Sequence, residues 1–422
     1  MPLPLFLLAV AVFAMGTSEF MLAGLLPDIA SDLDVTVGTA GTLTSAFAIG
    51  MIVGAPLMAG LARNWPGRSG LLGFVLVFVA AHVVGAGTSS FPVLVVSRMV
   101  AAFAYAGFLA VALTTATMLV SPDKKGRSLA VLLSGTTMAT IAGVPGGSVL
   151  GTMLGWRVTF WAVAALCLPA AIGIVRGIPG SSSRAAGSAS SRPARRVRRN
   201  AGDGPALGSE LAQLKRPRLL VVMLLGTVVN AATFAGFTFL APVVTDTAGL
   251  GELWISVALV LFGSGSFAGV TVAGRLSDRH PGRIVGIGGP LLLIGWPALA
   301  VLAERPAALL ALVFVQGALS FALGSTLITR VLYEAAGAPT MAGSYATAAL
   351  NVGAAVGPLI AATTLRPPAG ELGPLWTSGV LVLVALLVAV PLRGVITGGG
   401  SAGRSSDVQE CPLDRRETPE DG

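Results

Sequence analysis

Long apolar runs separated by short polar turns make up most of the chain. An α-helix needs about 20 predominantly apolar residues to cross the hydrocarbon core of a bilayer. The pattern therefore predicts an all-α membrane protein with twelve transmembrane helices. The twelve runs lie at residues 4–26, 39–60, 70–88, 91–119, 128–151, 159–178, 219–245, 253–274, 284–303, 306–329, 340–365 and 375–392.

The first run has two possible interpretations, a secretory signal or a span. It carries Glu19 and no basic segment precedes it, whereas a signal peptide has a positively charged start and a shorter apolar core. We therefore interpret it as the first span.

The composition agrees with a membrane protein. Charged residues are 11% of the chain, against about 25% in soluble globular proteins, which excludes a large soluble surface. Glycine is abundant and aromatic residues are scarce, a mixture that suits helices packed closely in lipid. The two cysteines, Cys167 and Cys411, lie in an apolar run and in a polar tail. Their placement predicts neither a disulfide framework nor a metal site.

The position of the basic residues predicts the topology. Of 27 Lys and Arg residues, 23 lie on the side of the membrane that holds both termini, and three (Arg157, Arg305 and Arg366) lie on the other. Because cytoplasmic loops carry the excess of Lys and Arg, both termini are predicted to be cytoplasmic. The arginine cluster at 192–199 is then interpreted as contacting anionic lipid, and nucleic acid is not expected as a partner.

The chain divides into two halves of six spans. Residues 1–178 form an N-terminal six-helix bundle and residues 217–395 a C-terminal one. A disordered, basic cytoplasmic linker is predicted at 179–216, and a cytoplasmic tail at 396–422. Similar basic turns, 60–68 and 274–283, occupy equivalent loops of the halves. Two bundles that rock around a central site are what a secondary transporter needs.

Ionisable residues deep in a membrane are costly and are candidates for function. Glu19 and Arg98 each lie seven residues from the outer end of a span, so both are expected roughly 10 Å inside the outer boundary. We interpret Glu19 as the proton-coupling group, because a cavity that opens and closes changes the protonation of a carboxyl. Arg98 is its expected partner. Purely structural roles for both remain open, and for His82 a hydrogen bond between helices is favoured.

Further polar and aromatic residues are candidates for lining a substrate cavity. Each has an alternative interpretation as a helix–helix hydrogen bond or as packing. The candidates are Met15, Tyr105, Phe108, Asn230, Phe234 and Gln316.

Small residues recur at intervals of four in the fifth span, where Gly143, Gly147 and Gly151 flank Pro145. Such a row favours close helix packing, and the proline bends the helix. The glycine-rich segments carry no Gly-Lys-Ser/Thr sequence, so they do not predict a phosphate-binding loop. No cofactor and no enzymatic activity are expected, and the energy source predicted is a proton gradient.

Several motifs resemble those of a known family. The turns at 60–68 and 274–283 resemble the loop signature of the major facilitator superfamily, and Arg98 and the glycines of the fifth span resemble its antiporter motifs. The segments at 15–22, 43–51, 107–113 and 155–161 resemble actinomycete chloramphenicol-resistance exporters, in the twelve-span drug:proton antiporter family. This resemblance covers about residues 1–395.

The resemblance implies proton-coupled export of a small apolar drug, chloramphenicol or a relative, from the bacterial plasma membrane by a monomer. It also implies a cytoplasmic gate in which Asp278 pairs with a nearby arginine. A sugar or metabolite exporter, a passive facilitator and a transporter-like sensor remain alternatives. The gate candidates are Asn64, Arg68, Arg127, Asp278, Arg279, Arg283 and Arg330.

Overall fold

The computed structural model describes residues 2–61, 67–121, 125–178, 207–276, 281–338, 341–367 and 370–389. Within these ranges the regular secondary structure is entirely helical. Twelve helical segments are long and apolar enough to cross a membrane. The predicted twelve-span, all-α fold is therefore confirmed.

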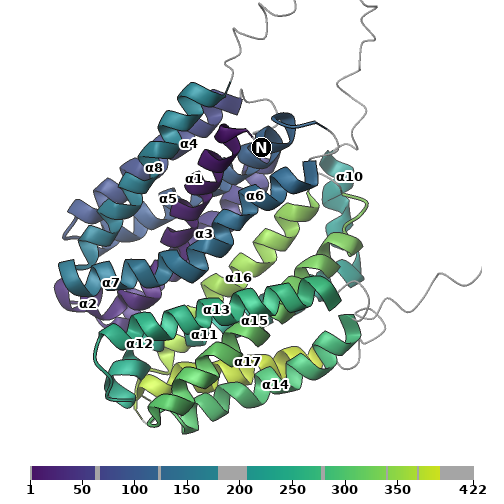
Figure 1. Cartoon of the computed structure of the whole chain (residues 1–422). Helices are drawn as coiled ribbons and strands as arrows, with labels where there is room; N and C mark the ends of the chain where they lie inside the picture. The colour runs from purple at the N-terminus through teal and green to yellow at the C-terminus, as the bar shows by residue number, and fades with distance from the viewer. Residues whose placement is uncertain are drawn as a thin grey trace, which may run out of the picture.

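The first half contains six spans, drawn in purple to blue in Figure 1. Two of them are not uniform α-helices: the first tightens into a 3₁₀ turn, and the fifth contains a π-helical turn. The spans are α1 (Leu3–Phe20) with η1 (Met21–Gly24), α3 (Val37–Leu61), α4 (Gly67–Gly87), α5 (Phe91–Met118), α6 (Lys125–Met138) with η4 (Ala139–Gly143) and α7 (Val144–Leu154), and α8 (Trp156–Gly177).

The second half, drawn in green to yellow in Figure 1, lies beside the first. Its first span is followed by a short helix and a π-helical turn, as the first span of the chain is followed by short helices. The spans are α11 (Pro217–Thr238) with α12 (Leu240–Pro242) and η6 (Val243–Thr247), α13 (Leu253–Leu276), α14 (Pro281–Val301), α15 (Pro306–Glu334), α16 (Ala342–Thr363), and α17 (Gly373–Ala389) after η7 (Gly370–Leu372).

Glycines bring neighbouring helices into backbone contact. A Cβ atom at Gly265 or Gly269 of α13 would overlap carbonyl oxygens of α15, and a Cβ at Gly353 or Gly357 of α16 would overlap carbonyls of α11. Lipid chains are as apolar as leucine, so helices in a membrane associate by close packing more than by the hydrophobic effect. The high glycine content therefore serves helix packing.

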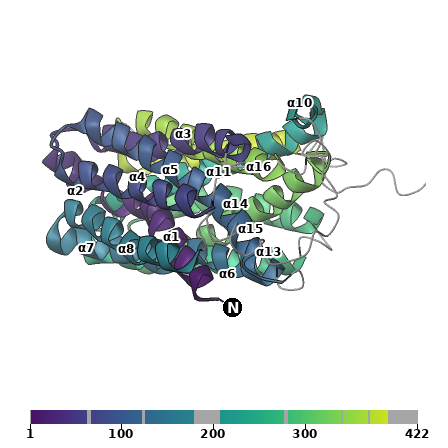
Figure 2. The same ribbon diagram turned by 90° about the horizontal axis from the view of Figure 1, so that it is seen from above.

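The two halves touch at the end of the molecule that both views show opposite α10 (Figures 1 and 2). The topology predicted from the sequence makes this the outer end. Here α2 (Leu26–Asp32) contacts α12 of the second half. A Cβ at Gly41 would lie 2.5 Å from the Phe239 ring, and one at Gly24 would lie 3.0 Å from Leu259. Deeper in the membrane, Ser45 of α3 donates a hydrogen bond to the Ala355 carbonyl of α16 at 2.7 Å.

The outer end of the first half is held by an ion pair. Asp32 at the end of α2 accepts hydrogen bonds from the guanidinium of Arg157 and, at 3.3 Å, from the indole Nε1 of Trp156. Arg157 also donates to the Thr88 carbonyl at 3.1 Å. These contacts join α2 to α8 and to the turn between α4 and α5.

The end of the predicted linker is folded, so the prediction of disorder across 179–216 does not extend to its last residues. Residues 207–215 form α10 (Leu207–Ala212) and a 3₁₀ turn, η5 (Gln213–Lys215). Glu210 is 1% exposed, its carboxylate accepts the Met341 N–H at 2.9 Å, and its carbonyl accepts the Tyr345 hydroxyl at 2.9 Å. A carboxylate is favourable at a helix N-terminus, which explains why this segment docks where α16 begins.

Candidate functional site

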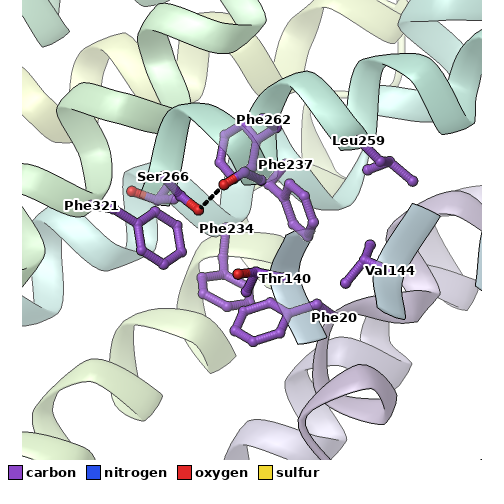
Figure 3. A pocket seen from close by; sticks show the side chains of 11 residues that line it. Phe20, Thr140, Val144, Phe234, Phe237, Leu259, Phe262, Ser266 and Phe321 are labelled. Carbon is purple, nitrogen blue, oxygen red and sulfur yellow. Dashed lines mark hydrogen bonds between the residues drawn. The ribbon is translucent and has the colours of Figure 1, made fainter. Parts of the chain in front are cut away.

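An aromatic pocket lies between the two halves (Figure 3). Three lining residues come from the first half and eight from the second, so the pocket exists only where the halves meet. The lining residues are Phe20, Thr140 and Val144, then Thr233, Phe234, Phe237, Leu259, Phe262, Gly263, Ser266 and Phe321.

The phenylalanines of the pocket form one connected cluster. The Phe20 ring lies 5.8 Å from that of Phe234 and 6.4 Å from that of Phe237. Phe262 lies 4.7 Å from Phe237 and 6.1 Å from Phe321. Such tilted and edge-to-face arrangements are favourable between aromatic rings. The side chains lining the pocket carry no charge, so the wall suits a neutral apolar or aromatic molecule.

Two residues before the pocket residue Phe20, Ser18 binds Arg98 in a buried hydrogen-bond network. Arg98 is 1% exposed, and its guanidinium donates to both the hydroxyl and the carbonyl oxygen of Ser18, each at 2.6 Å. Its central carbon also lies 4.5 Å from the centroid of the Phe47 ring. The structure thus pairs Arg98 with Ser18, the neighbour of the residue expected from the sequence.

The end of α1 explains why this carbonyl is available. The last four carbonyls of an α-helix have no amide of the helix to bind. Because α1 ends at Phe20 and the chain tightens into η1, the Ser18 carbonyl belongs to this group. Arg98 satisfies it from a neighbouring span and so stabilises the break in the first span.

His82 completes the network in the role favoured from the sequence. Its Nε2 lies 2.7 Å from the Ser18 hydroxyl, and its Nδ1 lies 2.9 Å from the Phe78 carbonyl. A guanidinium can only donate, so Ser18 Oγ accepts from Arg98 and gives its own hydrogen to His82 Nε2. His82 Nδ1 then carries the hydrogen that Phe78 accepts. Hydrogen-bond complementarity thus orders the network from Arg98 through Ser18 to His82.

Glu19 lies beside this network without joining it. Its side chain is half-buried, and no described residue donates a hydrogen bond to it. Arg98 is close enough to interact with it electrostatically. The next residue, Phe20, lines the pocket. Consecutive residues at the end of α1 therefore connect an unpaired carboxyl with the pocket wall.

The glycine row of the fifth span packs against the first span. Gly143, Gly147 and Gly151 lie next to residues that recur at the same interval of four in the first span. A Cβ at Gly143 or Gly151 would overlap its neighbour, and one at Gly147 would be 3.5 Å from the Met21 Cβ. Pro145 lies just after the π-helical turn η4. The facing residues are Thr17, Met21 and Leu25.

Most of the residues expected to line a cavity lie elsewhere. Met15, Tyr105 and Phe108 are at most 1% exposed and belong to the core of the first half. Gln316 is completely buried between α14 and α15, where its amide donates to the Leu292 carbonyl at 3.4 Å. These four are absent from the pocket because the face of the helix that carries each of them packs within its own half.

Two candidates on α11 are close to the pocket. Phe234 lines it. Asn230, one turn earlier, donates to the Leu350 carbonyl of α16 at 2.7 Å and so joins two helices of the second half. Asn230 therefore forms a hydrogen bond between helices, which was its alternative interpretation, whereas Phe234 lines a cavity as expected.

The gate candidates are mostly beyond what the structure describes. Asn64, Asp278 and Arg279 lie outside the described residues, and the side chain of Arg127 is also outside them. Arg68 and Arg330 are half-buried, and Arg283 is exposed. Within the described part of the chain these three arginines form no ion pair.

The family follows from comparison with known proteins. A model of the Major Facilitator Superfamily matches residues 8–358. The chain belongs to this superfamily. It is therefore a multi-pass membrane transporter rather than an enzyme, and its place is the plasma membrane.

Relatives and solved structures agree with this assignment. The transporter is 75% identical to a chloramphenicol resistance protein of Streptomyces lividans, over 95% of this chain and 99% of the relative. It is 31% identical to the inner membrane transport protein YdhP of Escherichia coli, covering 84% and 86%. A D-xylose-proton symporter has the same fold, with a TM-score of 0.68 at 15% identity over 91% and 96% of the two chains.

Several residues of this transporter's site were not among the candidates predicted from the sequence. Thr140, Thr233, Ser266 and Phe262 line the pocket, and Ser18 anchors Arg98. Serine and threonine are common in membrane helices, and their hydrogen bonds to helix carbonyls carry no sequence signal. The one sequence feature that indicated a role for any of them is that Ser18 directly precedes Glu19.

Proposed function

We propose that this transporter exports a small, neutral, aromatic drug in exchange for protons, and that chloramphenicol is a substrate. The observation that carries the proposal is the uncharged aromatic pocket between the halves, next to a carboxyl that no described residue hydrogen-bonds. The high identity to a chloramphenicol resistance protein supports the choice of drug. A substrate held between two halves is exposed to one side or the other as they rock.

Glu19 is the proposed proton carrier. Its side chain lies beside Arg98 and is covalently adjacent to the pocket residue Phe20. When drug occupies the pocket, Phe20 moves, and the environment of the neighbouring carboxyl changes with it. Protonation and drug binding thereby become alternatives at one end of α1, which is what antiport requires.

The remaining parts of the proposed transport cycle rest on the sequence alone. Asp278 forms a cytoplasmic latch with Arg279 or Arg330 that breaks when the inner side opens. The basic linker at 179–206 contacts anionic lipid and leaves the halves free to rock. The transporter acts as a monomer, because each chain contains both halves of the pocket.

The test is drug-stimulated proton movement in inverted vesicles that contain wild-type protein or the variants Glu19→Gln and Glu19→Asp. Glu19→Gln keeps the size of the side chain and cannot ionise, so we expect drug binding to persist and proton movement to cease. Glu19→Asp retains part of the coupling. Undiminished antiport by Glu19→Gln would remove Glu19 as the coupling group.

Two alternatives are separated by the same vesicles. A passive facilitator would move chloramphenicol at an unchanged rate after the proton gradient is collapsed. A sugar exporter would move sugars and leave chloramphenicol accumulation unchanged. The similarity to the xylose symporter concerns the fold alone, and the five phenylalanines of the pocket favour the drug.

A further inference from the structure

The polar side chains of the pocket are three hydroxyls, and each has already used its hydrogen. A hydroxyl that donates to a helix carbonyl still keeps lone pairs that accept hydrogen bonds. The lining side chains therefore offer acceptors and no unused donor. The bonds are Thr140 Oγ1 to Thr137 O at 2.9 Å, Thr233 Oγ1 to Val229 O at 3.0 Å and Ser266 Oγ to Gly263 O at 2.7 Å, the last drawn in Figure 3.

The π-helical turn next to Thr140 leaves one backbone oxygen without an amide of its own helix. In the π-helical turn η4, the Val144 N–H donates to the Ala139 carbonyl. The next bond of a π-helix would join the Thr140 carbonyl to the N–H five residues later, but residue 145 is proline and has no N–H. Neither amide therefore serves the Thr140 carbonyl.

This carbonyl packs against the second half. The Thr140 oxygen is the atom nearest to a Cβ built on Gly263, and both residues line the pocket. Because Gly263 has no side chain, the backbone of α13 can approach η4 closely here. This contact holds the Thr140 hydroxyl of the first half at the same pocket as the Ser266 hydroxyl of the second.

We propose that the pocket selects neutral aromatic molecules by the hydrogens of their hydroxyl and amide groups, which Thr140 and Ser266 accept from opposite halves. This proposal rests on the export function proposed above. Thr140 belongs to the first half and Ser266 to the second, so a ligand with two donors binds both halves at once. Ligands that carry acceptors alone gain only apolar packing, and anionic ligands meet further lone pairs.

Chloramphenicol has this chemistry, because it carries an aromatic ring, two hydroxyls and one amide N–H. The test compares its binding with that of a dideoxy congener, in which hydrogen replaces both hydroxyls. Dissociation constants are measured by calorimetry on the full-length transporter in lipid nanodiscs. Each lost hydrogen bond is expected to weaken binding about threefold to tenfold, so the wild type binds chloramphenicol at least that much more tightly.

Variants of the pocket residues test which side chains accept the hydrogen bonds of the ligand. Thr140→Val and Ser266→Ala are each expected to weaken chloramphenicol binding about threefold to tenfold and to leave dideoxy binding unchanged. Thr140→Ser regains the affinity lost in Thr140→Val, because it restores the acceptor. The matched control is Ser264→Ala, since this hydroxyl lies on the same helix as Ser266 and does not line the pocket.

Equal affinity of the wild type for the two ligands would overturn the inference, as would equal losses for both ligands in Thr140→Val and Ser266→Ala. Export is measured separately in vesicles. Export of both ligands at the same rate and affinity contradicts this inference and leaves the export function intact. Absence of export with the binding preference retained contradicts the export function and supports the chemistry of the pocket.

Discussion

The two halves share a six-span plan but carry different chemistry. The first half buries Arg98 and His82 and holds Glu19 beside them. In the described spans of the second half no charged side chain is buried, yet this half supplies eight of the eleven lining residues of the pocket. Repetition of a fold therefore does not imply repetition of its chemistry. One half provides the charges, and the other provides most of the binding wall.

The difference has a physical origin in the first span of each half. In the first half, α1 ends at Phe20, and the Ser18 carbonyl binds Arg98. In the second half, α11 continues to Thr238 and turns Phe234 and Phe237 towards the pocket. Like α1, α11 ends before a short helix, but no buried cation of the described second-half spans meets its last carbonyls.

The largest effect is expected from Arg98→Lys. A lysine presents a single ammonium in place of the planar fork that binds both oxygens of Ser18. Drug-coupled proton uptake in proteoliposomes should fall about 10- to 100-fold, while drug affinity stays within about twofold. Arg176→Lys, at an exposed position at the end of α8, is the control. Normal coupling in Arg98→Lys would contradict the division of roles.

The second prediction concerns the packing that holds η4 at the pocket. Gly143→Ala places a Cβ on Thr17, so we expect the free energy of unfolding to fall by about 1–3 kcal/mol. Gly146→Ala is the matched control, because no atom lies within 4 Å of its added Cβ. Thermal unfolding in detergent measures both. Similar losses in the two variants would show that the glycine row does not pack as described.

The third prediction tests the wall of the second half. Phe234→Ala removes a ring that packs against Phe20 and lines the pocket. Affinity for chloramphenicol should fall about tenfold, with proton coupling per drug molecule unchanged. The control is Phe267→Ala, because Phe267 on α13 is 49% exposed and does not line the pocket. This variant is expected to bind chloramphenicol normally. Loss of coupling in Phe234→Ala with retained affinity would reverse the roles assigned to the two halves.

The smallest effect is expected at the outer contact between the halves. Burial, and then the carboxylate of Glu252, raise the pKa of Asp28 above its ordinary value of 3.8. The conformation in which the outer ends of the two halves are in contact therefore binds a proton at Asp28 more tightly than a conformation in which those ends are separated. The resulting stabilisation is complete at low pH and is lost as the pH rises through the raised pKa.

Asp28→Asn should accordingly favour the closed outer contact at neutral pH and reduce its dependence on pH. Double electron–electron resonance between labels on the outer ends, at about pH 5 and about pH 8, measures the separation. An unchanged pH dependence in Asp28→Asn would assign the effect to another group. Asp246→Asn, on η6, is a control at the same end.

The sequence predicted some residues of the site and missed others for identifiable reasons. Glu19, Arg98 and His82 were recognisable because a charge or an imidazole within an apolar run is costly wherever it points. Gln316 and Tyr105 were misplaced because a polar residue in a span satisfies its hydrogen bonds equally well at a helix contact. Thr140 could not be found, since its place in the pocket wall depends on a neighbouring helix of the other half.

The sequence by itself determined the twelve spans, because the cost of placing polar groups in lipid acts on each segment separately. The tertiary structure alone decided which faces of those helices meet. It paired Arg98 with Ser18, docked Glu210 at the start of α16, and assembled the pocket from both halves. These contacts join residues up to hundreds of positions apart, and they depend on helix rotation and close packing, which an apolar run does not specify.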